Sequence, residues 1–137
     1  MEKRVLITGS SRGIGKETAL YLAKNGFNIV LHCHKNTKMA QEVSDEIKTL
    51  GADARILQFN IQNREECKRV LEKDISENGV YYGVVLNAGI ARDNVFPAME
   101  DSEWDEVLNT NLGGFYNVLR PIVMPMIEKR IKGRSEE

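Results

Sequence analysis

The sequence contains little cysteine, no long apolar run and no surplus of charge of one sign. Its two cysteines, Cys33 and Cys67, lack the CxxC spacing of a redox or zinc site, so we expect both to be buried free thiols. No apolar run approaches the roughly 20 residues of a membrane-spanning helix, and the first residues do not form a secretory signal. These absences favour a cytoplasmic protein that does not span a membrane.

The charges almost cancel, with 19 Lys and Arg against 20 Asp and Glu and a formal net charge of −1. Nonspecific binding to nucleic acid or to an anionic membrane needs a basic surplus on one face of the protein. The composition therefore supports neither partner. The 137 residues are enough for one hydrophobic core, since domains commonly contain about 100–150 residues. We expect a single domain over residues 1–137.

Short aliphatic runs alternate with helical patterns along the chain. The runs at 4–8, 28–33, 54–59 and 82–86 predict strands, and the intervals between them predict helices that end at Gly26, Gly51 and Gly79. Strands joined by helices need crossover connections, which place them parallel in one sheet with helices on both faces. The fold class is α/β, a doubly wound parallel sheet with about four strands in this chain.

Two further helix features can be predicted from the sequence. Asn63 and Glu66 resemble a capping box at the start of the third helix. Beyond the fourth strand we expect a short helix capped by Asp101, followed by a long helix from about residue 113 to residue 130. Pro121 and Pro125 fall inside the long helix, so we expect it to be bent or interrupted.

A glycine-rich loop joins the first strand to the first helix. Free amides and the positive dipole end of a helix favour an anion there, and phosphate is the natural guest. The loop is neither a P-loop nor a GxGxxG turn, because Ser10, Glu17 and Thr18 stand where those patterns need other residues. Nucleotide hydrolysis is therefore disfavoured. The loop consists of Gly9, Ser10, Ser11, Arg12, Gly13, Ile14 and Gly15.

With Thr8 before it, this loop resembles the cofactor loop of the short-chain dehydrogenase/reductase family. Asn87-Ala88-Gly89 after the fourth strand and Asn111 are similar to two further motifs of that family. The run from 87 to 93 resembles its 3-oxoacyl-acyl-carrier-protein reductase branch. The resemblance covers residues 4–134, about the first half of such an enzyme. It implies a Rossmann-like NAD(P)-binding domain, truncated after about four strands and incomplete at its C-terminal end.

The resemblance also implies which residues hold the cofactor. The second strand ends without the carboxylate that NAD-selective sites place there, whereas Arg12 can pair bidentately with a 2′-phosphate. NADP(H) is therefore favoured, with His34 beside that phosphate and Lys35 expected to help. Asn60 stands where the family usually has Asp. The predicted cofactor-binding residues are Gly9, Ser10, Ser11, Arg12, Gly13, Ile14, Gly15, His34, Asn60, Ile61, Asn87, Ala88 and Gly89.

The resemblance implies hydride transfer from NADPH to a carrier-linked 3-oxoacyl thioester in the complete enzyme. The family uses Ser, Tyr and Lys for this reaction, with Tyr and Lys spaced as Tyr-x-x-x-Lys beyond the long helix. No tyrosine of this chain is followed by lysine at that spacing. Asn111 matches the asparagine that orients a proton-relay water. We therefore expect a cofactor-binding half that is inactive by itself.

Two alternatives remain open. One is a non-catalytic nucleotide-binding or interaction module that needs a partner for missing strands; the other is an intact kinase or hydrolase, which the failed P-loop pattern disfavours. If the strands beyond it are missing, the fourth strand is paired on one side only and its outer side is an exposed edge. We therefore expect self-association or a homo-oligomer. His32 and His34 alternate on one strand face but have no third ligand at matching spacing, so we expect no metal site.

Overall fold

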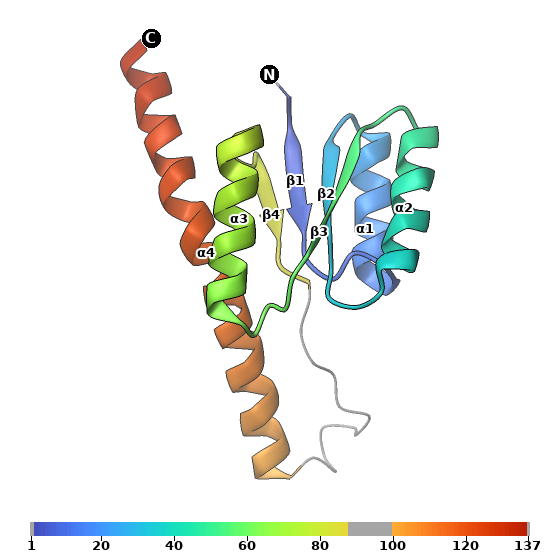
Figure 1. Ribbon diagram of the computed structural model, residues 1–137, viewed down its shortest axis with the longest axis vertical. Helices are drawn as coiled ribbons and strands as arrows, with labels where there is room; N and C mark the ends of the chain where they lie inside the picture. The colour runs from blue at the N-terminus through green and yellow to red at the C-terminus, as the bar shows by residue number, and fades with distance from the viewer. Residues whose placement is uncertain (1, 88–99, 137) are drawn as a thin grey trace.

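The computed structural model describes residues 2–87 and 100–136, and for residues 103–104, 106–111 and 131–136 it describes the helical backbone alone. Strands and helices alternate as predicted (Figure 1). None of the described helices combines the length and the apolar character needed to cross a bilayer. The elements are β1 (Arg4–Ile7), α1 (Gly13–Lys24), β2 (Asn28–Cys33), α2 (Thr37–Thr49), β3 (Ala54–Gln58), α3 (Arg64–Asn78), β4 (Gly83–Val85) and α4 (Asp101–Glu136).

The four strands form one parallel sheet in the order β3-β2-β1-β4. On β1, Val5 pairs with Ile29 of β2 on one side and with Gly83 of β4 on the other. The predicted parallel sheet is therefore confirmed. All strands run downward in Figure 1, so the segments that follow them meet at one edge of the sheet. In the described part, β4 is an outer strand that pairs with β1 alone.

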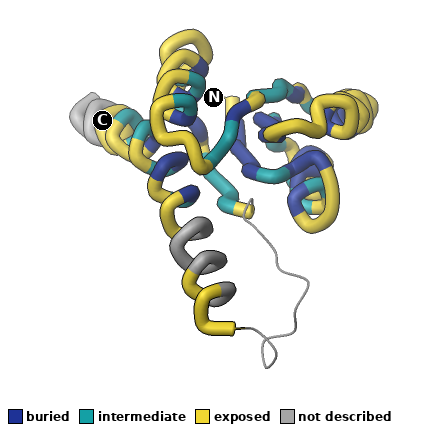
Figure 2. The backbone as a smooth tube through the Cα atoms, turned by 60° about the horizontal axis from the view of Figure 1, so that its bottom comes forward, coloured by how far each residue is buried: buried dark blue, intermediate teal, exposed yellow. Residues whose placement is uncertain are grey.

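Helices cover both faces of this sheet, as the strand patterns predict. Val5 and Ile7 of β1 pack with residues of α1 and α2, whereas Leu6 between them packs with residues of α3 and α4. A strand buried on both faces needs apolar residues at successive positions, which explains the continuous aliphatic runs. Figure 2 shows the buried residues along the strands and on the helix sides that face them.

Both cysteines are free and buried in this core, as expected. Cys33 ends β2, and Cys67 lies on α3 among the residues packed against the sheet. Burial, with the nearby Glu66 carboxylate, raises the pKa of the Cys67 thiol to about 11. The thiol is therefore protonated at neutral pH and unreactive in the folded protein.

The predicted capping box of α3 is formed only in part. The Asn63 side chain accepts a hydrogen bond from the Glu66 N–H at 3.0 Å, which is one half of the motif. The Glu66 carboxylate instead accepts from the N–H of Asn60 at 3.0 Å. The N–H of Asn63 is already bound to the Asn60 carbonyl, so it does not need the glutamate. Glu66 therefore fixes the segment before the helix.

The prediction of two separate helices after residue 100 is wrong. One helix, α4, runs for 36 residues from Asp101 and continues through Pro121 and Pro125. The two prolines are four positions apart, so the missing N–H groups lie on one side and the other turns keep their hydrogen bonds. Figure 2 shows that the axis of α4 changes direction along its length, which agrees with the predicted bend.

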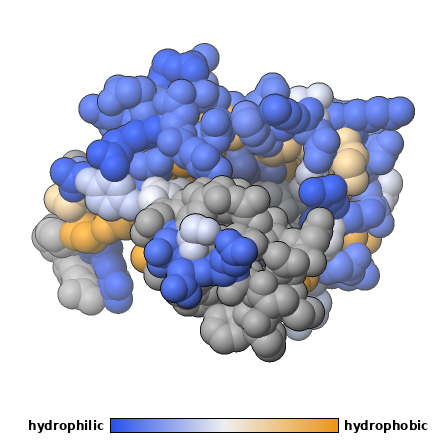
Figure 3. Space-filling model, turned by 90° about the horizontal axis from the view of Figure 1, so that it is seen from below, coloured by the Kyte–Doolittle hydropathy of each residue, from blue (hydrophilic) through white to orange (hydrophobic). Residues whose placement is uncertain are grey.

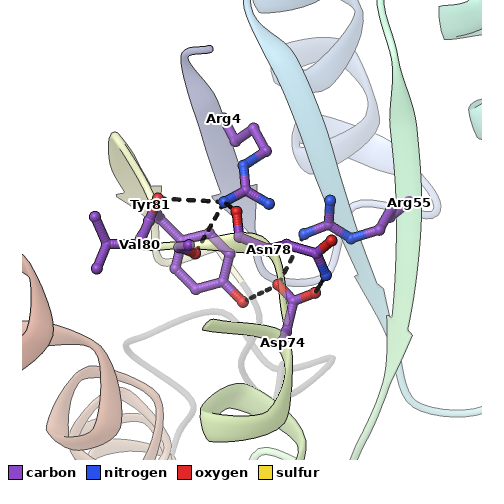
Figure 4. A network of polar contacts seen from close by, with 7 residues as sticks. Arg4, Arg55, Asp74, Asn78, Val80 and Tyr81 are labelled. Carbon is purple, nitrogen blue, oxygen red and sulfur yellow. Dashed lines mark hydrogen bonds and ion pairs between the residues drawn. The ribbon is translucent and has the colours of Figure 1, made fainter. Parts of the chain in front are cut away.

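A buried carboxylate joins α3 to the sheet at the edge away from the glycine-rich loop (Figure 4). One oxygen of Asp74 accepts from the Tyr81 hydroxyl at 2.6 Å and from the Arg55 guanidinium at 2.9 Å. Its other oxygen accepts from the Asn78 amide at 3.0 Å. Burial and the contact with Asp74 raise the pKa of Tyr81, so its hydroxyl stays a donor.

Arg4 of β1 holds the end of the same helix. Its guanidinium donates to the main-chain carbonyls of Asn78, Gly79 and Val80, at distances of 2.9 Å for Gly79 and 3.5 Å for Val80. These carbonyls belong to the last residue of α3 and to the two residues after it, where oxygen atoms have no partner within the helix. A buried arginine on the first strand therefore caps the third helix.

The Asp74 contacts predict different effects for two neighbouring tyrosines. Tyr81→Phe removes the hydroxyl bound to Asp74 and should lower the free energy of unfolding by about 1 to 2 kcal/mol. Tyr82→Phe is the matched control, because Tyr82 is 58% exposed and its ring contacts with Phe27 and Lys3 remain. Urea denaturation followed by circular dichroism measures both. Equal losses in the two variants would contradict a stabilising role for the Tyr81–Asp74 bond.

Candidate cofactor-binding site

A cleft of about 550 Å³ lies where the carboxyl ends of the four strands meet. In Figure 3, which views this end of the molecule, the visible described surface is mainly hydrophilic. Most of the predicted cofactor residues line the cleft: Gly9, Ser11, Arg12, Gly13, Ile14, His34, Asn60, Ile61 and Asn87. His32, Lys35, Asn36 and Gln62 line it as well.

Both main-chain polar groups of Gly9, its N–H and its carbonyl, have hydrogen-bond partners. It follows the end of β1 with a φ of 62°, a left-handed conformation that favours glycine. Its N–H donates to Nδ1 of His32 at 2.9 Å, and its carbonyl accepts from the Asn87 side chain at 3.1 Å. The Asn87 N–H in turn donates to the Thr8 hydroxyl at 2.9 Å. The start of the loop is therefore fixed to β2 and to the segment after β4.

Gly15 allows α1 to approach this point closely. A Cβ atom at Gly15 would lie 2.3 Å from the Gly9 carbonyl oxygen and 2.7 Å from Nδ2 of Asn87. Side chains cannot occupy that space without displacing the main chain. A glycine is therefore required at position 15, where it brings the first turn of the helix against the strand ends.

The N-terminus of α1 is left open toward the cleft. The residue before the helix, Arg12, is extended, no side chain caps the first amides, and no acidic residue stands in the first turn. Gly13 has a φ of 61°, and nothing lies within 4 Å of the place where its Cβ would be. Free amides, the positive dipole end and open space together make a place for a phosphate group.

The side chains around the cleft are basic rather than acidic. Arg12, His34 and Lys35 line it, and no Asp or Glu is among its described lining residues. The strand that ends near them, β2, has no carboxylate that could bind a ribose hydroxyl or repel a phosphate. The charge of the cleft therefore suits a ligand with several phosphate groups.

The segment after β3 is tied to two helices. Oδ1 of Asn60, a predicted cofactor-binding residue, accepts from the Gln62 N–H at 3.0 Å, so this oxygen already has one partner. The Ile61 carbonyl accepts from Asn117 of α4 at 2.9 Å, and Asn117 accepts from Arg64 of α3 at 3.1 Å. Sequence reasoning missed Asn117. The signal was a polar residue directly before Val118 on the buried side of α4.

Other predicted residues do not line the cleft. The Ser10 side chain is fully buried, and its oxygen accepts from the His32 N–H at 2.9 Å, so it binds β2 instead. Gly15 supports the loop from behind. Ala88 and Gly89 lie outside the described residues, and the side chain of Asn111 does so too. Ligand contacts of all the predicted residues stay predictions.

Residues 9–13 of the loop also match Gly-x-Ser-x-Gly, the pattern of a hydrolase nucleophile elbow, with Ser11 at the position of the nucleophile. Such a serine needs a histidine base within hydrogen-bond reach. Both ring nitrogens of His32 contact main-chain groups, those of Gly9 and Phe59. Within the described residues, no hydrogen bond joins Ser11 to His34. The arrangement therefore disfavours hydrolysis by Ser11.

A family model described as short chain dehydrogenase matches residues 3–134, almost the whole chain. The chain belongs to the short-chain dehydrogenase family. The predicted resemblance is confirmed, and so is the Rossmann-like α/β fold, with its parallel sheet and flanking helices. In this chain, the glycine-rich loop, the end of β2 and Asn87 meet at one cleft.

Similar curated proteins carry the name 3-oxoacyl-acyl-carrier-protein reductase FabG. The one from Aggregatibacter actinomycetemcomitans is 55% identical over 134 residues, which are 98% of this chain and 55% of that protein. FabG from Staphylococcus aureus is 38% identical over 95% of this chain and 53% of its own length, and FabG from Staphylococcus epidermidis is 36% identical over the same shares. The chain thus spans about half the length of these relatives.

The contacts of Gly15 predict a sharp difference between two glycine substitutions. Gly15→Ala should lower the free energy of unfolding by about 2 kcal/mol or more, because the new methyl group overlaps the Gly9 carbonyl. Gly113→Ala is the control. It meets nothing within 4 Å, and alanine favours a helix by about 1 kcal/mol over glycine. Thermal unfolding by circular dichroism would contradict the packing role if both variants behaved alike.

Proposed function

We propose that the cleft binds NADP(H), and that the chain is the cofactor-binding part of a carbonyl reductase acting on 3-oxoacyl thioesters. The observation that carries the proposal is the open N-terminus of α1 beside a cleft with basic side chains and no described carboxylate. The diphosphate would lie against the first amides of α1. The adenosine 2′-phosphate would lie beside Arg12 and His34, with Lys35 adding positive charge.

The preference for NADP(H) over NAD(H) rests on electrostatics. A carboxylate at the end of β2 would accept hydrogen bonds from ribose hydroxyls and repel a phosphate. His34 and Lys35 follow β2 instead, and both line the same cleft as Arg12. A guanidinium binds phosphate through two parallel hydrogen bonds, which adds both energy and geometric selectivity.

The reductase assignment rests on family membership and on the names of the similar proteins. Bound NADPH would supply a hydride. Asn111 is proposed to orient a proton-relay water, and the acyl carrier protein that the relatives' names mention would present the substrate. A cytoplasmic location and self-association through the outer strand β4 are part of the same proposal.

Arg12→Ala tests the cofactor assignment. Loss of the guanidinium should cost about 1.5 to 3 kcal/mol of NADPH binding, or about 10- to 150-fold in affinity, and should change NADH binding little. Lys16→Ala is the matched control: it removes a neighbouring positive charge that lies near Glu46 rather than in the cleft. Isothermal titration calorimetry with both dinucleotides measures the effect. Equal losses for NADPH and NADH would refute the 2′-phosphate contact.

The absence of Tyr-x-x-x-Lys from the 137 residues predicts binding without turnover. The chain by itself should bind NADPH but should not oxidise it in the presence of a short 3-oxoacyl thioester. The decrease of NADPH absorbance measures turnover, and a complete reductase of the family serves as the positive control. Turnover by this chain would show that other residues donate the proton.

A further inference from the structure

The two ring nitrogens of His32 have different main-chain partners. Nδ1 accepts the N–H of Gly9 at 2.9 Å, and Nε2 lies 2.8 Å from the carbonyl oxygen of Phe59. A carbonyl oxygen only accepts hydrogen bonds, so Nε2 must carry the proton. A main-chain N–H only donates, so Nδ1 must be unprotonated. These contacts together fit one state of the ring, the neutral Nε2–H tautomer.

The surroundings of His32 also favour the neutral ring. The residue is 3% exposed, and its ring contacts that of Phe59 at a centroid distance of 4.2 Å with an angle of 43° between the ring planes. Burial lowers the pKa of His32 and outweighs the hydrogen bond to Phe59, which raises it, while His34 lowers it further. Protonation is therefore resisted in the folded protein near neutral pH.

The ring connects three strand ends at the start of the cofactor loop. Through Gly9 it holds the second residue after β1, through Phe59 the first residue after β3, and it stands on β2 itself. A proton on Nδ1 would face the Gly9 N–H, so donor would meet donor and the glycine would have to move. The Gly9 carbonyl, its bond to Asn87 and the close contact with Gly15 would move with it.

We propose that neutral His32 is a positioning residue for the cofactor loop, and that a proton on its Nδ1 displaces Gly9 and weakens dinucleotide binding. The inference deepens the proposed function and rests on it for the identity of the ligand. His32 acts through Gly9 and α1, not by touching the reacting atoms.

Charged groups on the neighbouring elements act on this equilibrium in both directions. Arg12 of the loop, with His34 and Lys35 after β2, lines the same cleft, and positive charge there opposes protonation. The Glu66 carboxylate of α3 accepts from the Asn60 N–H next to Phe59, and its negative charge favours protonation of His32. Cys67 of α3 is an uncharged thiol at neutral pH.

The sign of the pH effect on stability follows from the lowered pKa. Below the ordinary histidine value of 6.5, an unfolded chain takes up a proton that folded His32 resists. Folding stability should therefore fall as the pH falls below 6.5, through the interval down to the pKa of the folded state. Dinucleotide affinity should fall in the same direction if protonation displaces Gly9.

Two variants separate the acceptor from the titrating ring. His32→Asn keeps an oxygen near the position of Nδ1 and does not titrate, whereas His32→Leu keeps bulk without an acceptor. Calorimetric titration with NADP⁺, which is stable in acid, is carried out on the full chain from about pH 7.5 to about pH 5. At the upper pH we expect His32→Asn to bind nearly as tightly as the wild type and His32→Leu about tenfold more weakly.

The pH profiles decide the proposal. The 2′-phosphate titrates near about pH 6, but it is present with every variant, as is the His34 side chain. The difference between wild type and His32→Asn therefore isolates His32: the wild type should lose more affinity on acidification. Ile47→Val, a mildly destabilised core variant away from the cleft, should keep the wild-type profile. Parallel profiles for wild type and His32→Asn would overturn the proposal.

A measurement without ligand separates this inference from the proposed function. Long-range proton–nitrogen NMR spectra identify the tautomer of His32, and the Gly9 amide signal should shift as His32 titrates. One outcome is that neither the wild type nor any variant binds NADP⁺ at any pH, while the Nε2–H tautomer and the coupled shift of the Gly9 signal are found. In that case the proposed cofactor is wrong, and the role of His32 in positioning Gly9 is supported. An Nδ1–H tautomer, or a Gly9 signal that ignores the titration, would overturn the role of His32.

Discussion

The site depends on the fixation of Gly9, a residue with no side chain whose N–H and carbonyl are both bound by side chains from other parts of the sheet. His32 binds the N–H, and Asn87 binds the carbonyl oxygen. The Gly9 carbonyl oxygen and the Asn87 amide nitrogen that bonds it are the two groups that a Cβ atom at Gly15 would meet, so the glycine at position 15 lets α1 lie against this bonded pair. The amides that would bind phosphate are thus placed by contacts behind the loop, and the cleft side is left free for the ligand.

The fold could be predicted from sequence because its rules are local. Strands buried on both faces need consecutive aliphatic residues, and helices that end at glycine are marked by position, so the order of elements and the parallel sheet were within reach. The continuity of α4 was not, because local rules treat each proline as a break, whereas Pro121 and Pro125 are spaced so that the rest of the helix survives.

The candidate site could be predicted only in part. The motif residues predict a cofactor cleft, and most of them line it. The sequence does not show which side chains bind the main chain of the loop on the side away from the cleft. Ser10 belongs to a motif yet binds β2, and Asn117 belongs to none yet binds the carbonyl of Ile61. The role of His32 depends on which main-chain groups lie beside its two nitrogens. That depends on the spacing of three strand ends, which no single segment of sequence encodes.

The positions of two arginines on the sheet affect which residues of such a protein can be substituted without loss of the fold. Arg4 and Arg55 clamp the last turns of α3 at the rim opposite the cleft, where no ligand is expected. Cohesion of the β–α layers and recognition of a nucleotide are therefore assigned to separate rims of one sheet. Substitutions at His34 and Lys35 would then change the proposed preference for NADP(H), while the opposite rim keeps the scaffold intact.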